Sequence, residues 1–142
     1  MTKVKICGLM EKEHVQVAID AGADAIGFVF APSKRKLTLD QAKLLAEEIP
    51  PHILKVGVFV NPSREELETV FREVPLDLVQ YHGNETSKFI QMNGFPSIKA
   101  LSILSEDDVA LAKKYTTEYF LFDATSSSLK IDNALIEGNP FI

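Results

Sequence analysis

The feature that most constrains the fold of this chain is a regular alternation of short apolar, β-rich runs with longer stretches of helical periodicity. Six strands are predicted, at Val4–Cys7, Ala25–Phe30, Leu54–Val60, Leu76–Tyr81, Ser97–Ile103 and Tyr119–Phe122. Each strand and the helix after it take about 20–30 residues, which is enough for a crossover between parallel strands. The alternation therefore predicts an α/β chain built on a parallel sheet.

The predicted helices begin at polar caps and end at glycines. A hydroxyl residue followed three positions later by Gln, Glu or Asp predicts a helix start. This pattern occurs at Thr38-x-x-Gln41, Ser63-x-x-Glu66 and Ser105-x-x-Asp108. Two further helices are predicted over Glu11–Asp20, before Gly22, and over Ser87–Met92, before Gly94, because glycine favours helix C-termini.

Two architectures fit a parallel sheet of this kind. Strands such as Val56–Val60 are almost continuously apolar, which predicts cover on both faces. A doubly wound open sheet and a (β/α)8 TIM-type barrel both provide it. The first strand is not followed by G-x-G-x-x-G, which disfavours a dinucleotide-binding sheet, and the regular repetition favours the barrel. Such barrels usually need about 200 residues or more, whereas the chain has 142.

The C-terminal part of the sequence leads us to expect an incomplete barrel. After Asp123, a helix is predicted over Ile131–Glu137, and Phe141-Ile142 reads as the start of a strand. We expect one partial barrel domain over residues 1–142, with about six βα units and the start of a seventh strand, truncated at its C-terminus. Unpaired edges on the first and last strands predict either low independent stability or self-association.

Composition limits the partners and the compartment. The formal net charge is −5, which argues against nucleic acid or an anionic membrane as a partner. The single cysteine cannot form an internal disulfide, as expected in a reducing cytosol. No signal peptide and no run of about 18 apolar residues is present. The sequence thus predicts a cytoplasmic, soluble protein.

Chemically useful side chains follow the predicted strands. In parallel α/β folds the C-terminal ends of the strands form one functional rim. The rim positions are Cys7-Gly8, residues 30–35, Asn61, residues 80–85, Ala100 and Asp123. A thiol (Cys7), a guanidinium (Arg35), an imidazole (His82) and a carboxylate (Asp123) are therefore expected on the same rim.

Each of these residues also has a purely structural interpretation. Cys7 could be a buried small hydrophobe, Arg35 a solvated loop charge, and His82 a helix cap. The Asp123 carboxylate could bind loop amides or act as a general acid. A nucleophilic pair of Cys7 and His82 stays open, because spacing does not establish contact. The remaining histidines lack ligand spacing, so no metal site is predicted.

Six short motifs occur in one order along the chain. They are Lys5-Ile6-Cys7-Gly8-Leu9, Gly27-Phe28-Val29-Phe30-Ala31-Pro32-Ser33-Lys34-Arg35, Val56-Gly57-Val58-Phe59-Val60-Asn61, Gln80-Tyr81-His82-Gly83, Ile98-Lys99-Ala100 and Leu121-Phe122-Asp123. With these motifs the chain closely resembles the phosphoribosylanthranilate isomerase family of tryptophan biosynthesis over about residues 3–124.

The resemblance implies a (β/α)8 barrel that catalyses a cofactor-independent Amadori rearrangement. N-(5-phosphoribosyl)anthranilate, a small phosphorylated sugar derivative, would become 1-(2-carboxyphenylamino)-1-deoxyribulose 5-phosphate. By similarity, Asp123 would be the general acid that opens the sugar ring, and Cys7 the general base. Arg35 would pair with the anthranilate carboxylate, while His82 and Gly8 would line the substrate site.

The chain departs from the family pattern after its sixth strand. Ser126-Ser127-Ser128-Leu129-Lys130 stands where the family has G-G-[ST]-G-K, and sequence for the last two strands, which should hold the substrate phosphate, is essentially absent. Without this phosphate-binding part the chain could be inactive by itself, and the alternative is a non-catalytic barrel fragment that folds or acts only with a partner chain. Indole-glycerol-phosphate synthase and ribulose-phosphate epimerase fit less well, because the lysine-centred and metal-binding residues expected of them are not seen.

Overall fold

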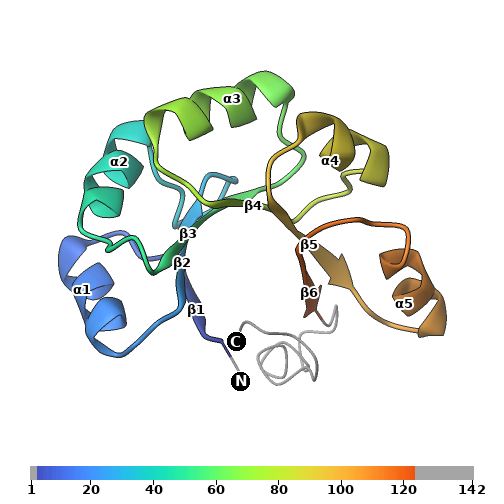
Figure 1. Ribbon diagram of the computed structural model, residues 1–142, viewed down its shortest axis with the longest axis horizontal. Coiled ribbons are helices and arrows are strands. Elements are labelled where there is room, and N and C mark those ends of the chain that lie inside the picture. Colours follow the sequence, from blue (N-terminus) through green and yellow to red (C-terminus); the bar gives the residue numbers. More distant parts are fainter. Residues whose placement is uncertain (1–2, 124–142) are drawn as a thin grey trace.

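The computed structural model of the protein describes residues 3–123, which form a parallel six-stranded sheet with helices along one side (Figure 1). The strands are β1 (Lys5–Cys7), β2 (Ala25–Val29), β3 (Leu54–Phe59), β4 (Leu78–Tyr81), β5 (Ser97–Ser102) and β6 (Tyr119–Asp123). The helices are α1 (Lys12–Asp20), α2 (Leu39–Glu47), α3 (Arg64–Glu73), α4 (Ser87–Asn93) and α5 (Glu106–Ala112). The features predicted at Ser126–Lys130, Ile131–Glu137 and Phe141-Ile142 lie outside the described residues.

The order of the strands decides between the two predicted architectures. Neighbours in the sheet are also neighbours in sequence, from β1 through β6, and every pair is parallel. The strands follow an arc, and the helices lie on its outer side (Figure 1). A doubly wound sheet would reverse its strand order and carry helices on both faces. The barrel-type prediction is therefore confirmed, and the described part is six strands of it.

Within residues 3–123 the predicted strands and helices are confirmed, with ends that differ by at most two residues. The largest difference is at β4, which begins at Leu78 rather than Leu76, because Leu76 forms a turn back to Val74 and packs in the core.

The predicted helix caps are also found, although not all are complete. At α2 the capping box is complete, with Thr38 and Gln41 bonded reciprocally at 2.9 and 3.1 Å. At α3 the Ser63 hydroxyl accepts from the Glu66 N–H at 3.0 Å, which is the serine half of the predicted box. These bonds satisfy helix N–H groups that have no partner within the helix.

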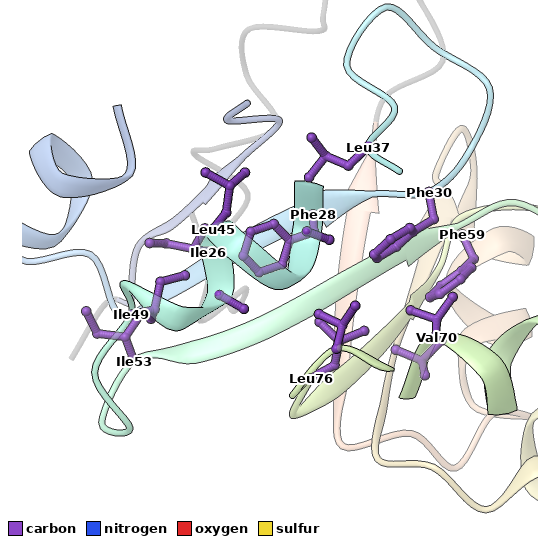
Figure 2. Packing of buried hydrophobic residues seen from close by; sticks show 14 of the residues in the cluster. Ile26, Phe28, Phe30, Leu37, Leu45, Ile49, Ile53, Phe59, Val70 and Leu76 are labelled. Atoms are coloured by element: carbon purple, nitrogen blue, oxygen red, sulfur yellow. The ribbon is translucent and has the colours of Figure 1, made fainter. Parts of the chain in front are cut away.

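Two hydrophobic clusters lie on opposite faces of the sheet. The larger joins the sheet to its helices: Phe28 and Phe59 from the strands pack with residues such as Leu45 and Val70 from the helices (Figure 2). The smaller consists of strand residues on the inner face of the arc: Ala25, Val56, Leu78 and Ile98. Successive strand residues point to opposite faces, which explains why the apolar runs are nearly continuous.

Carboxylates tie the strands together at the N-terminal rim. Asp24 accepts a hydrogen bond from the Val4 N–H at 2.8 Å. In the same way, Asp77 accepts from Lys55 N–H at 2.8 Å, and Glu118 accepts from Ser97 N–H at 2.6 Å. Each acidic residue just before or at the start of one strand thus binds the beginning of the preceding strand. These three carboxylates therefore stabilise the N-terminal rim and lie away from the C-terminal ends of the strands.

We expect Leu67→Ala to lower the free energy of unfolding by about 3–5 kcal/mol, because Leu67 is fully buried between α3 and the sheet. Leu44→Ala removes the same atoms from a helix position that is 52% exposed, and should cost no more than about 0.5 kcal/mol. Urea unfolding of both variants measures the difference. Equal losses would contradict the assignment of the core.

Candidate functional site

Cys7 ends β1 on the inner face of the arc. It is a free, half-buried thiol and pairs in register with Gly27 of β2. A Cβ atom at Gly27 would lie 2.8 Å from Cys7 Sγ, so the missing side chain makes room for the sulfur. The Gly8 N–H, immediately after the thiol, donates to the Gly27 carbonyl at 3.2 Å. The sulfur is thereby held at the strand end and stays partly accessible.

Arg35 lies directly against Gly8. A Cβ atom at Gly8 would lie 2.6 Å from Arg35 Cδ and 2.9 Å from its Nη1, and Gly8 has a φ of +84°, which favours glycine. The loop before Arg35 turns back on itself, because the Ser33 hydroxyl accepts from Arg35 N–H at 3.0 Å and Leu37 N–H donates to the Val29 carbonyl at 2.8 Å. Three predicted site residues, Cys7, Gly8 and Arg35, are therefore neighbours.

His82 follows β4 farther along the same rim. Gln80 Nε2 lies 3.1 Å from His82 Nδ1, and the His82 backbone N–H donates to the Phe59 carbonyl at 2.8 Å. Gln80 is only 2% exposed. Its Oε1 has no hydrogen-bond partner in the part of the chain that the structure describes. Gln80 falls in the predicted rim segment 80–85, but no role was predicted for it; a polar residue in an otherwise apolar strand was the available signal.

A cavity of 390 Å³ opens at the C-terminal ends of β3, β4 and β5. Its lining includes Asn61, His82, Gly83, Asn84 and Ser102. Asn61 has a φ of +47°, which is rare for a residue with a side chain. Its Oδ1 accepts from the Asn84 N–H at 2.8 Å, so the loops after β3 and β4 are joined directly.

Asp123 is the last residue of β6 and pairs in register with Ser102 of β5. Its backbone therefore reaches the same rim as the ends of the other strands. Cys7 and His82 do not sit on adjacent strands, because β2 and β3 lie between β1 and β4. The sheet order gives no support to a nucleophilic Cys7–His82 pair.

A buried ion pair beneath this rim was not anticipated from the sequence. Lys99 Nζ lies 3.1 Å from Glu85 Oε1, and both side chains are 1% exposed. A lysine inside an apolar strand was the available signal, since a buried charge requires a partner. Among residues 3–123, no three His, Cys, Asp or Glu side chains are grouped in a way that could hold a metal ion.

Comparison with known proteins identifies one family. The family model described as N-(5'phosphoribosyl)anthranilate (PRA) isomerase matches residues 4–140. Curated proteins named N-(5'-phosphoribosyl)anthranilate isomerase, from Bacillus mycoides and Bacillus cereus, are 51% and 49% identical over 122 residues. In each case the match covers 86% of this chain and 60% of the relative. The chain thus spans about three fifths of the length of these relatives.

Solved structures agree with the sequence comparison. The phosphoribosyl anthranilate isomerase of Thermotoga maritima superposes with a TM-score of 0.84 at 36% identity, over 89% of this chain and 63% of that one. A phosphoribosyl anthranilate isomerase solved with reduced 1-(o-carboxyphenylamino)-1-deoxyribulose 5-phosphate gives a TM-score of 0.83 at 36% identity, over 92% and 69%.

Gly8→Ala should change the rate at which a thiol reagent labels Cys7, because the new methyl group displaces Arg35. Gly22→Ala is the matched control: Gly22 also has a positive φ, +88°, but its added Cβ would meet no atom within 4 Å. Both variants should lose about 1–2 kcal/mol of stability through backbone strain. Labelling kinetics separate the two effects, and equal rates in both variants would contradict the contact.

Proposed function

This chain belongs to the N-(5'phosphoribosyl)anthranilate isomerase family, and we propose that it carries the proton-transfer half of that enzyme's active site. The observation that supports this most directly is that Cys7 ends β1 and that Arg35 lies against Gly8, the next residue along the chain. A thiol and a guanidinium at the same strand end suit a substrate with an acidic C–H bond and a carboxylate.

The proposed reaction converts N-(5-phosphoribosyl)anthranilate to 1-(2-carboxyphenylamino)-1-deoxyribulose 5-phosphate. Asp123, as the carboxylic acid, donates a proton to the furanose ring oxygen while the bond from C1' to that oxygen breaks. The anilino nitrogen supplies the electron pair, giving a protonated Schiff base. The Cys7 thiolate then removes the C2' proton, and the electrons of that bond form the C1'–C2' double bond of the enolamine.

The last step forms the carbonyl group at C2'. The C2' hydroxyl loses its proton, C1' gains one, and the product is the ketose; no electrons enter or leave overall. In this scheme Arg35 holds the anthranilate carboxylate through its planar fork. His82 and Gly8 line the substrate site without transferring protons.

We extend the proposal to the domain, its compartment and its assembly. Residues 1–142 would act as one partial barrel domain in the cytoplasm, and β1 and β6, the edge strands of the sheet in residues 3–123, would allow self-association. Within residues 3–123, no helix is both long enough and apolar enough to cross a membrane. A non-catalytic fragment that acts only with a partner chain stays the alternative, and the next experiment separates the two.

We expect the 142-residue chain to support growth of a tryptophan auxotroph that lacks the isomerase, and Cys7→Ala and Asp123→Ala to abolish it. Loss of a general acid or base typically costs about 10²–10⁴-fold in rate. Asp107→Ala, at an exposed carboxylate in α5, is the matched control and should grow. Soluble expression of the unaltered chain without growth would contradict catalysis and favour the partner-dependent alternative.

A further inference from the structure

The ammonium group of Lys99 is placed where three acceptors converge. Lys99 lies in β5, between Ile98 and Ala100, and its side chain is on the helix-facing side of the sheet, opposite to Ile98. Nζ donates to the Gly83 carbonyl at 2.7 Å, to Glu85 Oε1 at 3.1 Å and, at 3.5 Å, to the Tyr81 carbonyl. These three contacts match the three N–H donors of a lysine.

The Glu85 carboxylate binds the backbone of two different loops. Oε2 accepts from the Asn61 N–H, after β3, at 2.7 Å, and Oε1 accepts from the Gly83 N–H, after β4, at 2.9 Å. The Tyr115 hydroxyl donates to the Glu85 carbonyl at 2.8 Å. The two bonds from backbone N–H groups to the carboxylate are charge-assisted, and such bonds are the stronger hydrogen bonds in proteins. One buried carboxylate thus fixes both loops.

The loops after β3 and β4 approach each other so closely that no side chain fits at Gly83. A Cβ atom at Gly83 would lie 2.6 Å from Asn61 Oδ1 and 2.9 Å from the Asn61 backbone nitrogen. Together with His82, these residues line the 390 Å³ cavity at the rim. An apolar pair in place of Glu85 and Lys99 could fill the same volume, since such replacements of buried ion pairs are often tolerated. It could not bind the loop N–H and carbonyl groups.

We propose that Glu85 and Lys99 are positioning residues, whose buried ion pair holds Asn61 and residues 82–84 in the arrangement that the substrate site requires. This inference rests on the proposed function, which supplies the identity of the substrate that the site would bind. The loop arrangement itself is measurable without any activity.

The phenol of Tyr115 lies close enough to Glu85 to sense its carboxylate. Burial raises the pKa of Tyr115 above 10.0, and the Glu85 carboxylate raises it further. We therefore expect Glu85→Gln to lower the pKa of Tyr115 towards 10.0, because the negative charge beside the phenol is removed. Alkaline titration of the tyrosine NMR signals measures this shift. An unchanged Tyr115 pKa would contradict the electrostatic interaction between Tyr115 and Glu85.

The decisive variant is Glu85→Leu combined with Lys99→Met in the full chain. We expect an unfolding midpoint within about 5 °C of the parent. Hydrogen exchange at Asn61 and Gly83 should be at least tenfold faster, and the ¹⁵N heteronuclear NOE values of residues 82–84 should fall. The matched control replaces the exposed Arg64–Glu68 pair, whose atoms are 2.9 Å apart, by Met and Leu, and should leave both measurements unchanged.

Kinetics of the same variants test the link to the substrate. If the parent chain turns over substrate, the double variant should lose at least tenfold in kcat/KM, whereas the Arg64–Glu68 control should lose less than twofold. A parent without turnover overturns the proposed function, and the exchange and NOE data then decide the inference alone. Loops as ordered as in the parent, or unchanged kcat/KM, would overturn the inference.

A variant that keeps the buried charge covers the case in which the double variant does not fold. Glu85→Asp keeps a carboxylate for Lys99 but shortens the side chain by one methylene group, which draws its oxygens away from the loop N–H groups. We expect at least threefold faster exchange at the Gly83 N–H, with the exchange of β2 amides unchanged. Equal exchange at Gly83 in this variant and in the parent would overturn the proposal.

Discussion

The structure depends on the unbroken parallel pairing of its six described strands in sequence order. In such a sheet all strand C-termini meet at one rim, so residues far apart in sequence become neighbours there. Arg35 is separated from Cys7-Gly8 by a helix and a strand, yet it lies against Gly8. Without this pairing, the thiol and the guanidinium would belong to unrelated loops.

The two rims of the sheet differ in the polar groups that they carry and in what those groups bind. At the N-terminal rim, Asp24, Asp77 and Glu118 each accept a hydrogen bond from a strand amide, which fixes the beginnings of the strands. At the C-terminal rim, Cys7 and Gln80 lie at or near the ends of their strands, and Asn61 lines the cavity of 390 Å³. This division is typical of barrels, in which one end stabilises and the other carries the chemistry.

Much of this arrangement could be predicted from the sequence, because it depends on periodicity and local signals. The six strands, the five helices and the Thr38 cap follow from apolar spacing and capping patterns, and Cys7, Gly8 and Arg35 follow from their place after strands. The pairing of Lys99 with Glu85 could not be predicted, because it depends on which face of β5 the lysine occupies. A boundary such as Leu78 was missed because Leu76 is equally apolar and packs in the same core.

The Glu85–Lys99 pair also limits how this protein can diversify. In many barrels the loops after the strands can be exchanged with little effect on folding, which lets one scaffold acquire new specificities. Here the loops after β3 and β4 share one carboxylate beneath them, so a change in either alters the support of the other. Sequence variation at this rim should therefore be tolerated more readily in the loop after β2, which contributes Arg35, than in this coupled pair of loops.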